Sequence, residues 1–498
     1  METRPILDDA VAKAALPAER LLAPLPIVSP PLVVDLDGTI LKTDLLIESL
    51  LVLVKQNPLF LFLLPFWLLK GRAYLKRQIA SRIHLDTSTL PYRADFVAHL
   101  KAEHERGRSL VLATAADDQL ARQVADYLGI FDLILASDGM TNLAGESKRD
   151  RLVSIFGERG FDYAANGFSD LPVWSSARKA IVANRGPLFQ LWAARKTQIE
   201  RVFRRPKLGL ADFLKPLRLR HWLKNLLVFV PLFAAHRYFE TALLLKAILA
   251  FVAFGCCASG GYVFNDLFDL ATDRHHPDKR LRAFASGNLP LTYGLAIIPV
   301  LLGLGCAIAL KVSPLFLGVL LIYVFLTMAY SLYVRKVVLL DVIFLAGLYS
   351  MRIMAGSAAI GVRPSQWLLA FSTFLFFSLA LVKRYGELVI MKRQDGDHAK
   401  SRGYELGDGE LLAAMGAASG YVAVLVLALY VESDTAQSIY GRPELMWFIC
   451  PLLLYWVSHI WLFAHRGKMP DDPVVFATHD RVSCVLIALM VAITLLAL

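Results

Sequence analysis

Residues 260–287 read GGYVFNDLFDLATDRHHPDKRLRAFASG and follow directly on a long apolar run. On a helix that turns by about 100° per residue, Asn265, Asp266, Asp269 and Asp273 share one face. Three carboxylates on one face repel each other unless a cation joins them, and oxygen ligands of this kind suit Mg²⁺. The segment predicts a magnesium site beside a membrane surface; the alternative is a solvated loop between two spans.

The same segment continues with four cations that could contact phosphate oxygens. They are Arg274, Lys279, Arg280 and Arg282. An acidic face followed by a basic stretch is typical of a site for a metal-complexed phosphate compound. We therefore expect catalytic roles for Asp266 and Asp269, with Asp273 as a third metal ligand.

The whole chain is too apolar for an ordinary soluble enzyme. Its 498 residues are 56% hydrophobic and 19% charged, with mean hydropathy +0.51, whereas soluble proteins have about 45–50% and about 25%. Residues 1–200 have the mixed composition of a soluble domain, and long apolar runs begin at about 222. The sequence predicts a soluble-type domain followed by a polytopic membrane domain.

Run length predicts that the membrane domain is all-α, with about nine transmembrane helices. The expected spans are 222–238, 241–264, 289–310, 314–334, 338–360, 366–382, 411–431, 444–463 and 483–498. Most Lys and Arg residues of this half lie in the loops 265–288, 335–337, 383–410 and 464–482. The positive-inside rule then puts these loops and the amino terminus in the cytoplasm. We expect a multi-pass protein of the inner (cytoplasmic) membrane with cytoplasmic active sites.

The net charge of +11 indicates a lipid partner and no nucleic acid. Ten Lys or Arg residues and only two acids lie between Arg195 and Lys224, just before the first apolar run. Cations at this position stay in the cytoplasm and attract anionic lipid. The start METRPILDD lacks the pattern of a cleaved signal peptide. The front domain is therefore expected in the cytoplasm, against the lipid bilayer.

Residues 28–195 alternate short β-rich runs with helical stretches, which predicts a Rossmann-like α/β domain with a parallel sheet. The expected strands are 32–35, 109–114, 132–136, 163–165 and 180–183. An N-terminal extension is expected at 1–27, a helical cap at about 44–106, and a basic juxtamembrane linker at 196–221. The apolar run within the cap is interrupted by two prolines. Two interpretations of it stay open: a cap that touches the bilayer surface, and a buried helical cap.

The segment LVVDLDGTIL places Asp35 and Asp37 just past the first expected strand. One carboxylate can attack a phosphoryl group while the other, held protonated, serves the leaving group. Thr114 at the second strand end, Lys148 after a loop and Asp170 after the fourth strand accompany them. A nucleophile, a phosphate-binding hydroxyl, a neutralising Lys and a metal-binding Asp predict phosphoryl transfer.

At these residues the front domain resembles the haloacid dehalogenase superfamily of phosphatases. The resemblance implies that Asp35 is the nucleophile, that Asp37 is the acid/base, and that Thr114 and Lys148 contact phosphate. It also implies Mg²⁺ on Asp35, Asp170 and the carbonyl of Asp37.

One position departs from that superfamily. After the fourth strand, where a first acidic residue is usual, this chain has Asn166. Asn can still orient a metal-bound water, so activity is compatible with the change. The alternative is a degenerate domain kept as a scaffold.

The Asp-rich segment and the nine expected spans resemble the UbiA-type intramembrane prenyltransferase superfamily over about residues 205–498. There the aspartates hold Mg²⁺ on a diphosphate facing the cytoplasm, and a second Asp-rich motif usually follows the sixth span. Here that place is held by LVKRYGELVIMKRQDGDH, in which only Asp395 and Asp397 remain.

The segments RLRHWLKNLLVFVPL, NDLFDLATDRHHPDKR and KRYGEL are similar to the decaprenyl-phosphate phosphoribosyltransferase branch. The resemblance implies phosphoribosyl pyrophosphate as donor and the phosphate of a polyprenyl lipid as acceptor. Such a donor needs one Mg²⁺ cluster and one cationic cluster, for which we expect Lys224, Asn225, Lys383, Arg384 and Glu387. On a helix Lys383 can pair with Glu387, leaving Arg384 to bind the 5-phosphate as a fork.

Three functions are compatible with these patterns. The first is a bifunctional enzyme that transfers 5-phosphoribose to a polyprenyl phosphate and then removes the 5-phosphate. The second is a prenyltransferase that acts on an aromatic or other small acceptor, with a separate phosphatase. The third is a transporter or lipid-binding scaffold with two decayed sites. The KRYGEL segment favours the first over the second, and the oligomeric state is not predicted.

Overall fold

The structure is a computed structural model that describes residues 29–183, 186–204, 208–395, 403–469 and 472–498. The chain divides into two compact units, residues 1–207 and residues 208–498, each with its own apolar cores. The extension expected at 1–27 and Asp397 lie outside the described residues, as does the side chain of Asp395.

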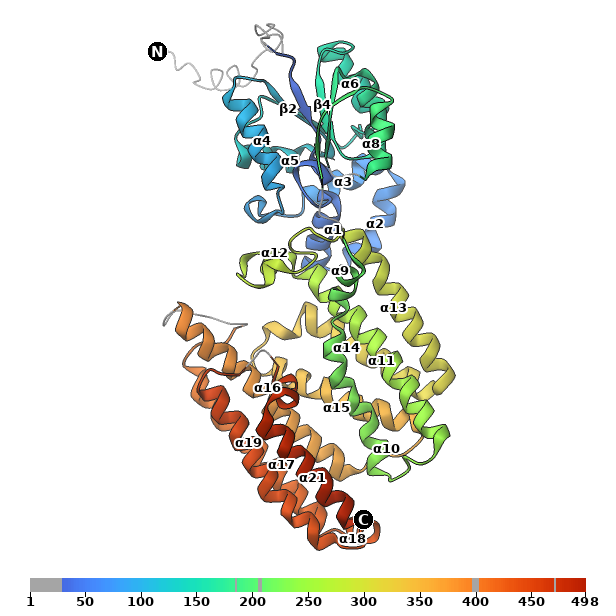
Figure 1. Ribbon diagram of the computed structural model, residues 1–498, viewed down its shortest axis with the longest axis vertical. Coiled ribbons are helices and arrows are strands. Elements are labelled where there is room, and N and C mark those ends of the chain that lie inside the picture. Colours follow the sequence, from blue (N-terminus) through green and yellow to red (C-terminus); the bar gives the residue numbers. More distant parts are fainter. Residues whose placement is uncertain (1–28, 184–185, 205–207, 396–402, 470–471) are drawn as a thin grey trace, which may run out of the picture. The chain divides into compact units, whose positions relative to one another are not determined.

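The front unit is built on a six-stranded sheet in which every pairing is parallel (Figure 1). The strand order is β3-β2-β1-β4-β5-β6. The strands are β1 (Leu32–Val34), β2 (Leu110–Asp117), β3 (Leu133–Ser137), β4 (Asp162–Ala165), β5 (Lys179–Ala183) and β6 (Gln198–Phe203). The parallel sheet and its five expected strands are confirmed. The sixth strand, β6, lies in the segment expected as a linker.

Strand β1 lies at the centre of the sheet because it is apolar on both faces. Leu32 and Val34 enter the core on one face, and Val33 enters the core on the other, as the two-residue period of a strand requires. The first core is covered by α1 (Leu45–Gln56), α3 (Arg72–Ala80), α4 (Ala94–Glu105) and α5 (Asp118–Leu128). The second is covered by α6 (Glu146–Phe156), α7 (Leu171–Ser176) and α8 (Pro187–Ala194).

Among the helices of the predicted cap, α2 (Phe60–Leu69) differs from the others because its apolar side chains are mostly exposed. Phe62 is 73% exposed, Phe66 64% and Leu69 85%, and only Trp67 is buried. For this helix the structure does not support a buried cap. Helix α2 therefore presents an apolar surface to its surroundings. The exposed basic residues Lys70 and Arg72 lie next to this surface, at the end of the helix.

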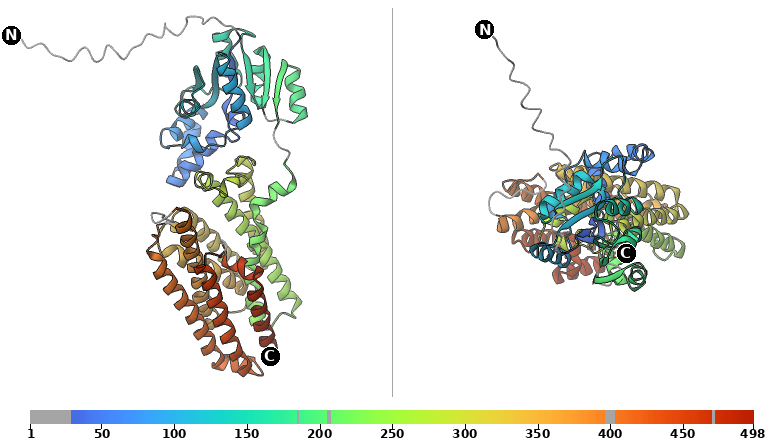
Figure 2. Two further views of the ribbon diagram at one scale, coloured as in Figure 1. Left: turned by 60° about the vertical axis from the view of Figure 1, so that its left-hand side comes forward. Right: turned by 90° about the horizontal axis from the view of Figure 1, so that it is seen from above.

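The membrane unit consists of helices, and α16, α17 and α19 pack alongside one another (Figures 1 and 2). Its longer helices are α11 (Thr241–Phe268), α13 (Leu291–Val312), α14 (Pro314–Leu332), α15 (Leu340–Ile360), α16 (Gln366–Asp395), α17 (Asp408–Val431), α19 (Ile449–His465) and α21 (Arg481–Ala497). Shorter helices are α9 (Leu210–Leu214), α10 (Val230–Ala234), α12 (Leu270–His275), α18 (Asp434–Ile439) and α20 (Pro473–His479).

The prediction of nine spans is too high. Within the described residues, seven helices are long and apolar enough to cross a membrane, or eight if α20 and α21, bent by 83°, count as one span. The first expected span, 222–238, is instead a 3-10 helix, η6 (Leu219–Phe229), followed by the five-residue α10. Pro231 at the start of α10 has no N–H to continue a helical ladder.

Candidate active sites

The front unit gathers its predicted site residues where the strand order reverses, between β1 and β4. Asp35 directly follows β1, and Asp170 ends the short turn η4 (Phe168–Asp170) after β4. In open parallel sheets this switch point, at the carboxyl ends of the strands, is where ligands bind. Lys148 of α6 reaches the same place, because its Nζ lies 2.7 Å from Oδ1 of Asp35 and 3.6 Å from Oδ1 of Asp170.

A tyrosine that the sequence did not single out completes this cluster. The hydroxyl of Tyr163, in β4, accepts from Lys148 at 3.0 Å and donates to Asp170 Oδ1 at 2.8 Å. The other Asp170 oxygen accepts from the Gly167 amide at 3.0 Å. Asp35, Lys148 and Asp170 are therefore held in one buried hydrogen-bonded network.

Asp37 is held by a turn that requires glycine. Its Oδ1 accepts from the Leu45 amide at 2.7 Å, at the start of α1. Gly38 has φ +71°, and a Cβ there would lie 1.9 Å from the side-chain nitrogen of Asn166. Asn166 thus packs directly against the turn at residues 35–39.

The two aspartates of the turn differ in proton affinity. Burial raises the pKa of Asp35 to about 6, although Lys148 opposes the rise. Burial, the Asp44 carboxylate and the Asp35 carboxylate raise the pKa of Asp37 to about 8. Near neutral pH one group is ionised and the other protonated, the division that a nucleophile and a general acid need.

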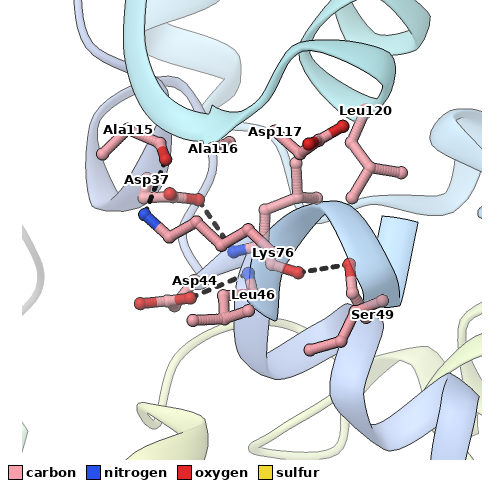
Figure 3. Close-up of a pocket in the computed structure, with 11 residues that line it drawn as sticks. Asp37, Asp44, Leu46, Ser49, Lys76, Ala115, Ala116, Asp117 and Leu120 are labelled. Carbon is pink, nitrogen blue, oxygen red and sulfur yellow. Dashed lines mark hydrogen bonds between the residues drawn. The ribbon is translucent and has the colours of Figure 1, made fainter. Parts of the chain in front are cut away.

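A cavity of about 140 Å³ lies beside Asp37, between the strand ends and the cap (Figure 3). Lys76 of α3 crosses it, and its Nζ donates to the Ala115 carbonyl at 2.6 Å and to Asn142 Oδ1 at 2.7 Å. Burial lowers the pKa of Lys76. Thr114 does not line this cavity: β2 continues past it to Asp117, and its Oγ1 accepts from the Ala116 amide at 3.1 Å.

In the membrane unit the predicted Asp-rich helix breaks at Asp269. Asn265 and Asp266 end α11, Asp269 lies between α11 and α12, and Asp273 lies in α12. The four residues therefore do not lie on one continuous helix as the sequence suggested.

We call residues 265–273 the acidic loop, and its three aspartates, Asp266, Asp269 and Asp273, are each paired with arginine. Asp266 contacts Arg218 at 2.5 Å and Arg282 at 3.3 Å, and Asp273 contacts Arg282 at 2.7 Å. The guanidinium of Arg335 contacts both carboxylate oxygens of Asp269. Since one nitrogen of Arg282 contacts both Asp266 and Asp273, it occupies a cation position between two carboxylates.

The four cations expected to contact phosphate have different surroundings. Arg282 forms the ion pairs with the aspartates, whereas Arg274 donates to the Ala285 carbonyl at 2.9 Å. Lys279 and Arg280 lie in the turn η7 (Lys279–Leu281), where Arg280 is exposed. Lys279 is close enough to Asp273 to interact with it electrostatically. All four therefore lie in or beside the acidic loop, with Arg282 at its centre.

Arg384 has charged and polar partners that the sequence did not predict. Arg384 is 1% exposed and forms ion pairs with buried Asp341 and, at 2.7 Å, with Glu387, while Tyr330 accepts from it at 2.7 Å. Glu387 therefore contacts Arg384 directly and is also close enough to Lys383, the predicted partner, to interact with it electrostatically. All three nitrogens of the Arg384 guanidinium take part in these contacts, which join α16 to α14 and α15.

Of the remaining predicted residues, Lys224 and Asn225 lie near the start of the membrane unit, and Lys383 lies in α16. Lys224, in η6, forms an ion pair with Asp472, the N-terminal cap of α20. Lys383 of α16 is close enough to interact electrostatically with both. Asn225, also in η6, accepts from Arg352 of α15 at 3.1 Å.

A sequence model of the UbiA prenyltransferase family matches residues 226–479, half of the chain. The chain belongs to the UbiA prenyltransferase family. This UbiA-family chain is 35% identical over 473 residues to the "Uncharacterized protein y4nM" of Sinorhizobium fredii, covering 94% of this chain and 91% of that one. That similarity spans both units.

Two further relatives match the UbiA-type unit. The "Nodulation protein NoeC" of Azorhizobium caulinodans is 37% identical over 281 residues, covering 56% of this chain and 91% of that one. The "Decaprenyl-phosphate phosphoribosyltransferase" of Corynebacterium glutamicum is 34% identical over 203 residues, covering 40% and 61%.

The acidic loop of the UbiA-type unit has the donor set that Mg²⁺ prefers, but the donors do not converge. Among the described residues, no group of three His, Cys, Asp or Glu side chains lies close enough to hold an ion. The side-chain oxygen of Asn265 is buried and has no hydrogen-bond partner, so it is available as a ligand. If the Arg282 side chain moved away, a Mg²⁺ ion could take the place of its nitrogen between Asp266 and Asp273. On that condition the oxygen ligands of the acidic loop fit magnesium.

Sequence reasoning missed several charged residues of this unit: Asp341, Arg352 and Asp472, and the pairing roles of Arg218 and Arg335. A usable signal existed for two of them. Asp341 and Arg352 are charges within apolar runs, and such charges usually face the interior of a helix bundle and serve its function.

Proposed function

We propose that this protein is a bifunctional membrane enzyme that makes polyprenyl-phosphoryl ribose. Its UbiA-type unit transfers 5-phosphoribose from phosphoribosyl pyrophosphate to a polyprenyl phosphate, and its front unit removes the 5-phosphate. The observation that carries the proposal is the convergence of Asp35, Lys148 and Asp170 at the switch point of a parallel sheet, in one chain with a UbiA-type unit.

The transfer step is a substitution at ribose C1. An oxygen of the lipid phosphate forms a bond to C1, and the bond from C1 to the pyrophosphate oxygen breaks. Bound Mg²⁺ would supply positive charge to the leaving pyrophosphate, with Asp266, Asp269, Asp273 and Asn265 as its ligands. Once released from the carboxylates, Arg282 would be positioned to bind the departing phosphate oxygens.

The donor assignment is supported by relatives and by the residues of α16. The similar Corynebacterium protein is named a decaprenyl-phosphate phosphoribosyltransferase. At the end of the sixth expected span, α16 has Lys383, Arg384 and Glu387, and its aspartate, Asp395, comes only at the last residue of the helix. A site with one acidic loop fits a donor that has one pyrophosphate and one separate 5-phosphate.

For the second step we assign the front unit to the haloacid dehalogenase superfamily, with Asp35 as nucleophile. Asp35 forms a bond to phosphorus while the bond to the ribose 5-oxygen breaks, and Asp37 donates its proton to that oxygen. Water then attacks the phosphorus of the aspartyl phosphate, Asp37 takes its proton, and inorganic phosphate leaves. Lys148 neutralises phosphate charge, and Asp35, Asp170 and the Asp37 carbonyl would hold a second Mg²⁺.

Fusion of the two units has a kinetic advantage. A lipid product confined to the same membrane meets a tethered phosphatase at high effective concentration. The similarity to the Sinorhizobium protein across both units supports a functional coupling. We place both active sites on the cytoplasmic side of the inner membrane, with the exposed apolar α2 at the bilayer surface.

The test is incubation of the purified full-length protein with phosphoribosyl pyrophosphate labelled in the ribose, polyprenyl phosphate and Mg²⁺, followed by lipid extraction. We expect label in the lipid fraction and a product without 5-phosphate. An Asp269→Asn variant serves as control and should give no labelled lipid. Label confined to water, together with prenyl transfer from a prenyl diphosphate to a small aromatic acceptor, would favour the alternative function.

A further inference from the structure

The membrane unit contains a buried arginine, Arg352, whose charge no carboxylate balances in the described part of the chain. Other cations of the unit are paired with Asp or Glu: Arg218, Lys224, Arg282, Arg335 and Arg384. Arg352 lies at the middle of α15, is 5% exposed, and contacts only neutral groups.

Aromatic rings and neutral oxygens fix the Arg352 guanidinium in place. Its Nε donates to Asn225 Oδ1 at 3.1 Å, its Nη2 donates to the Tyr323 hydroxyl at 3.1 Å, and its Nη1 donates to the Leu348 carbonyl. The rings of Phe254, Tyr323 and Tyr349 lie 5.2, 5.1 and 5.4 Å from the guanidinium carbon. Such contacts orient a cation but do not neutralise it, and an unbalanced charge inside a membrane protein usually marks a functional site.

Asn225 adds hydrogen-bond donors that also lack a partner. It is 1% exposed, and its side-chain nitrogen has no hydrogen-bond partner. A guanidinium has five N–H donors, of which three are used here, so Arg352 and Asn225 together present unused donors at one place. Donors arranged in this way match an anion with several acceptor oxygens.

Close packing of η6 against α15 brings Asn225 and Arg352 together. A Cβ at Gly356 would lie 2.0 Å from the Val228 carbonyl, so η6 packs directly against α15 at this glycine. Arg352 is one helical turn before Gly356, and Asn225 is one turn before Val228.

A second cation, Lys224, lies near the Arg352 guanidinium. Its Nζ lies 5.5 Å from the centre of the Tyr349 ring, the same ring that the Arg352 guanidinium contacts. Lys224 in turn interacts with Lys383 and Asp472. Lys383 also interacts with Glu387 and Arg384, and Arg384 pairs with Asp341. Four cations and three carboxylates then leave this region with one net positive charge, that of the unpaired Arg352.

We propose that Arg352 and Asn225, with Lys224 beside them, form a binding site for a phosphate monoester. A guanidinium fork and an amide match several phosphate oxygens at once, and a phosphate supplies the negative partner that Arg352 does not find among the described carboxylates. The proposal deepens the proposed function, on which it rests for its substrates. Both of these carry the required group: the lipid acceptor as its phosphate head, and the donor as its 5-phosphate.

The test measures binding without turnover. Ribose 5-phosphate and farnesyl phosphate are titrated separately into the full-length protein in nanodiscs, and binding is followed by microscale thermophoresis. The variants are Arg352→Met, which removes the charge, and Asn225→Asp, which gives Arg352 a carboxylate partner. Arg363→Met, at an exposed position after α15, removes the same charge elsewhere and is the matched control.

We expect both site variants to bind one probe at least tenfold more weakly than the wild type and the control. The probe that is lost identifies the source: ribose 5-phosphate means the donor, and farnesyl phosphate means the lipid. Asn225→Asp should keep or raise the melting temperature, so it decides the question even if Arg352→Met fails to fold. Unchanged affinities for both probes, or no binding of either by the wild type, would overturn the proposal.

If the proposed function fails, this site can still hold. Lost probe binding in the variants of a protein that makes no ribosyl lipid would show a phosphate site that serves another phosphate-bearing substrate. Normal ribosyl lipid synthesis with unchanged probe binding in Asn225→Asp would keep the function and remove the site.

Discussion

The phosphatase step should weaken in alkaline solution because Asp37 must be protonated to serve the leaving group. Asp37 has a pKa of about 8, raised by its burial and by the carboxylates of Asp44 and Asp35. Well below this pH Asp37 is protonated. One pH unit above it, Asp37 is protonated in only about a tenth of the enzyme molecules. We therefore expect kcat/KM to fall at least about tenfold between pH 8 and pH 10. The limb on the acid side, set by Asp35, should lie at or below pH 6, because bound Mg²⁺ favours its ionised form.

Asp44→Asn tests the physical cause of the alkaline limb. Removing the like charge should lower the pKa of Asp37 and move the limb to lower pH. Each pH unit of displacement corresponds to about 1.4 kcal/mol of repulsion between the two carboxylates. The helix should be unaffected, because Asp44 caps α1 by accepting from the Leu46 and Ile47 amides at 2.9 and 3.2 Å, and an Asn oxygen does the same.

The assay is hydrolysis of a water-soluble phosphate monoester by the full-length protein at saturating Mg²⁺, from pH 5 to pH 10. Asp86→Asn is the matched control: Asp86 caps a turn of the same cap by accepting from the Ser88 amide at 3.1 Å, and it is not among the charges that act on Asp37. An alkaline limb at the same pH in wild type and Asp44→Asn would refute the electrostatic reasoning. A rate that still rises through pH 9 would remove Asp37 as the acid.

Three further outcomes are expected. Asp35→Asn should accumulate the 5-phosphorylated lipid while pyrophosphate release continues, whereas chromatography showing the wild-type product would separate the front unit from that lipid. Arg384→Lys should lower the melting temperature, since fork contacts to two carboxylates are worth about 1–3 kcal/mol each; an altered Michaelis constant for phosphoribosyl pyrophosphate with unchanged melting would restore a substrate role. A spin label at Phe62 in proteoliposomes should be accessible to oxygen but shielded from a water-soluble nickel reagent. A control label at exposed Met140 should be accessible to the nickel reagent. Equal nickel accessibility at both positions would place α2 in water.

The front unit was readable from sequence because its signals are local. A strand alternates its side chains over a few residues, and an aspartate after an apolar run marks the strand end, so Asp35, Lys148 and Asp170 could be expected to meet. Strand β6 was missed since its QIERVF sequence carries charge at an edge position and resembles the basic stretch around it. Tyr163 gave no signal, because an inward-facing tyrosine on a buried strand is usually core.

In the membrane unit, composition predicted helices but not partners. Which acid a given arginine meets depends on how helices far apart in sequence pack, as with Arg384 and Asp341, which are 43 positions apart. Along α16, Glu387 is within reach of both Lys383 and Arg384, whereas the contact of Arg384 with Asp341 depends on how α15 and α16 pack. The first expected span failed for a local reason, since its run length satisfied the apolar criterion while Pro231 interrupted the helix.

The arginine pairs of the acidic loop affect how the protein rests between reaction cycles. With Asp266, Asp269 and Asp273 each matched by guanidinium, the loop is self-neutralised when no substrate is present. Under the proposed function, removal of Mg²⁺ by a chelator should therefore stop activity without lowering the melting temperature. The donor and its metal would have to displace these internal partners, which would weaken their binding and favour release of pyrophosphate. A loop of bare carboxylates would hold its metal more tightly and cycle more slowly.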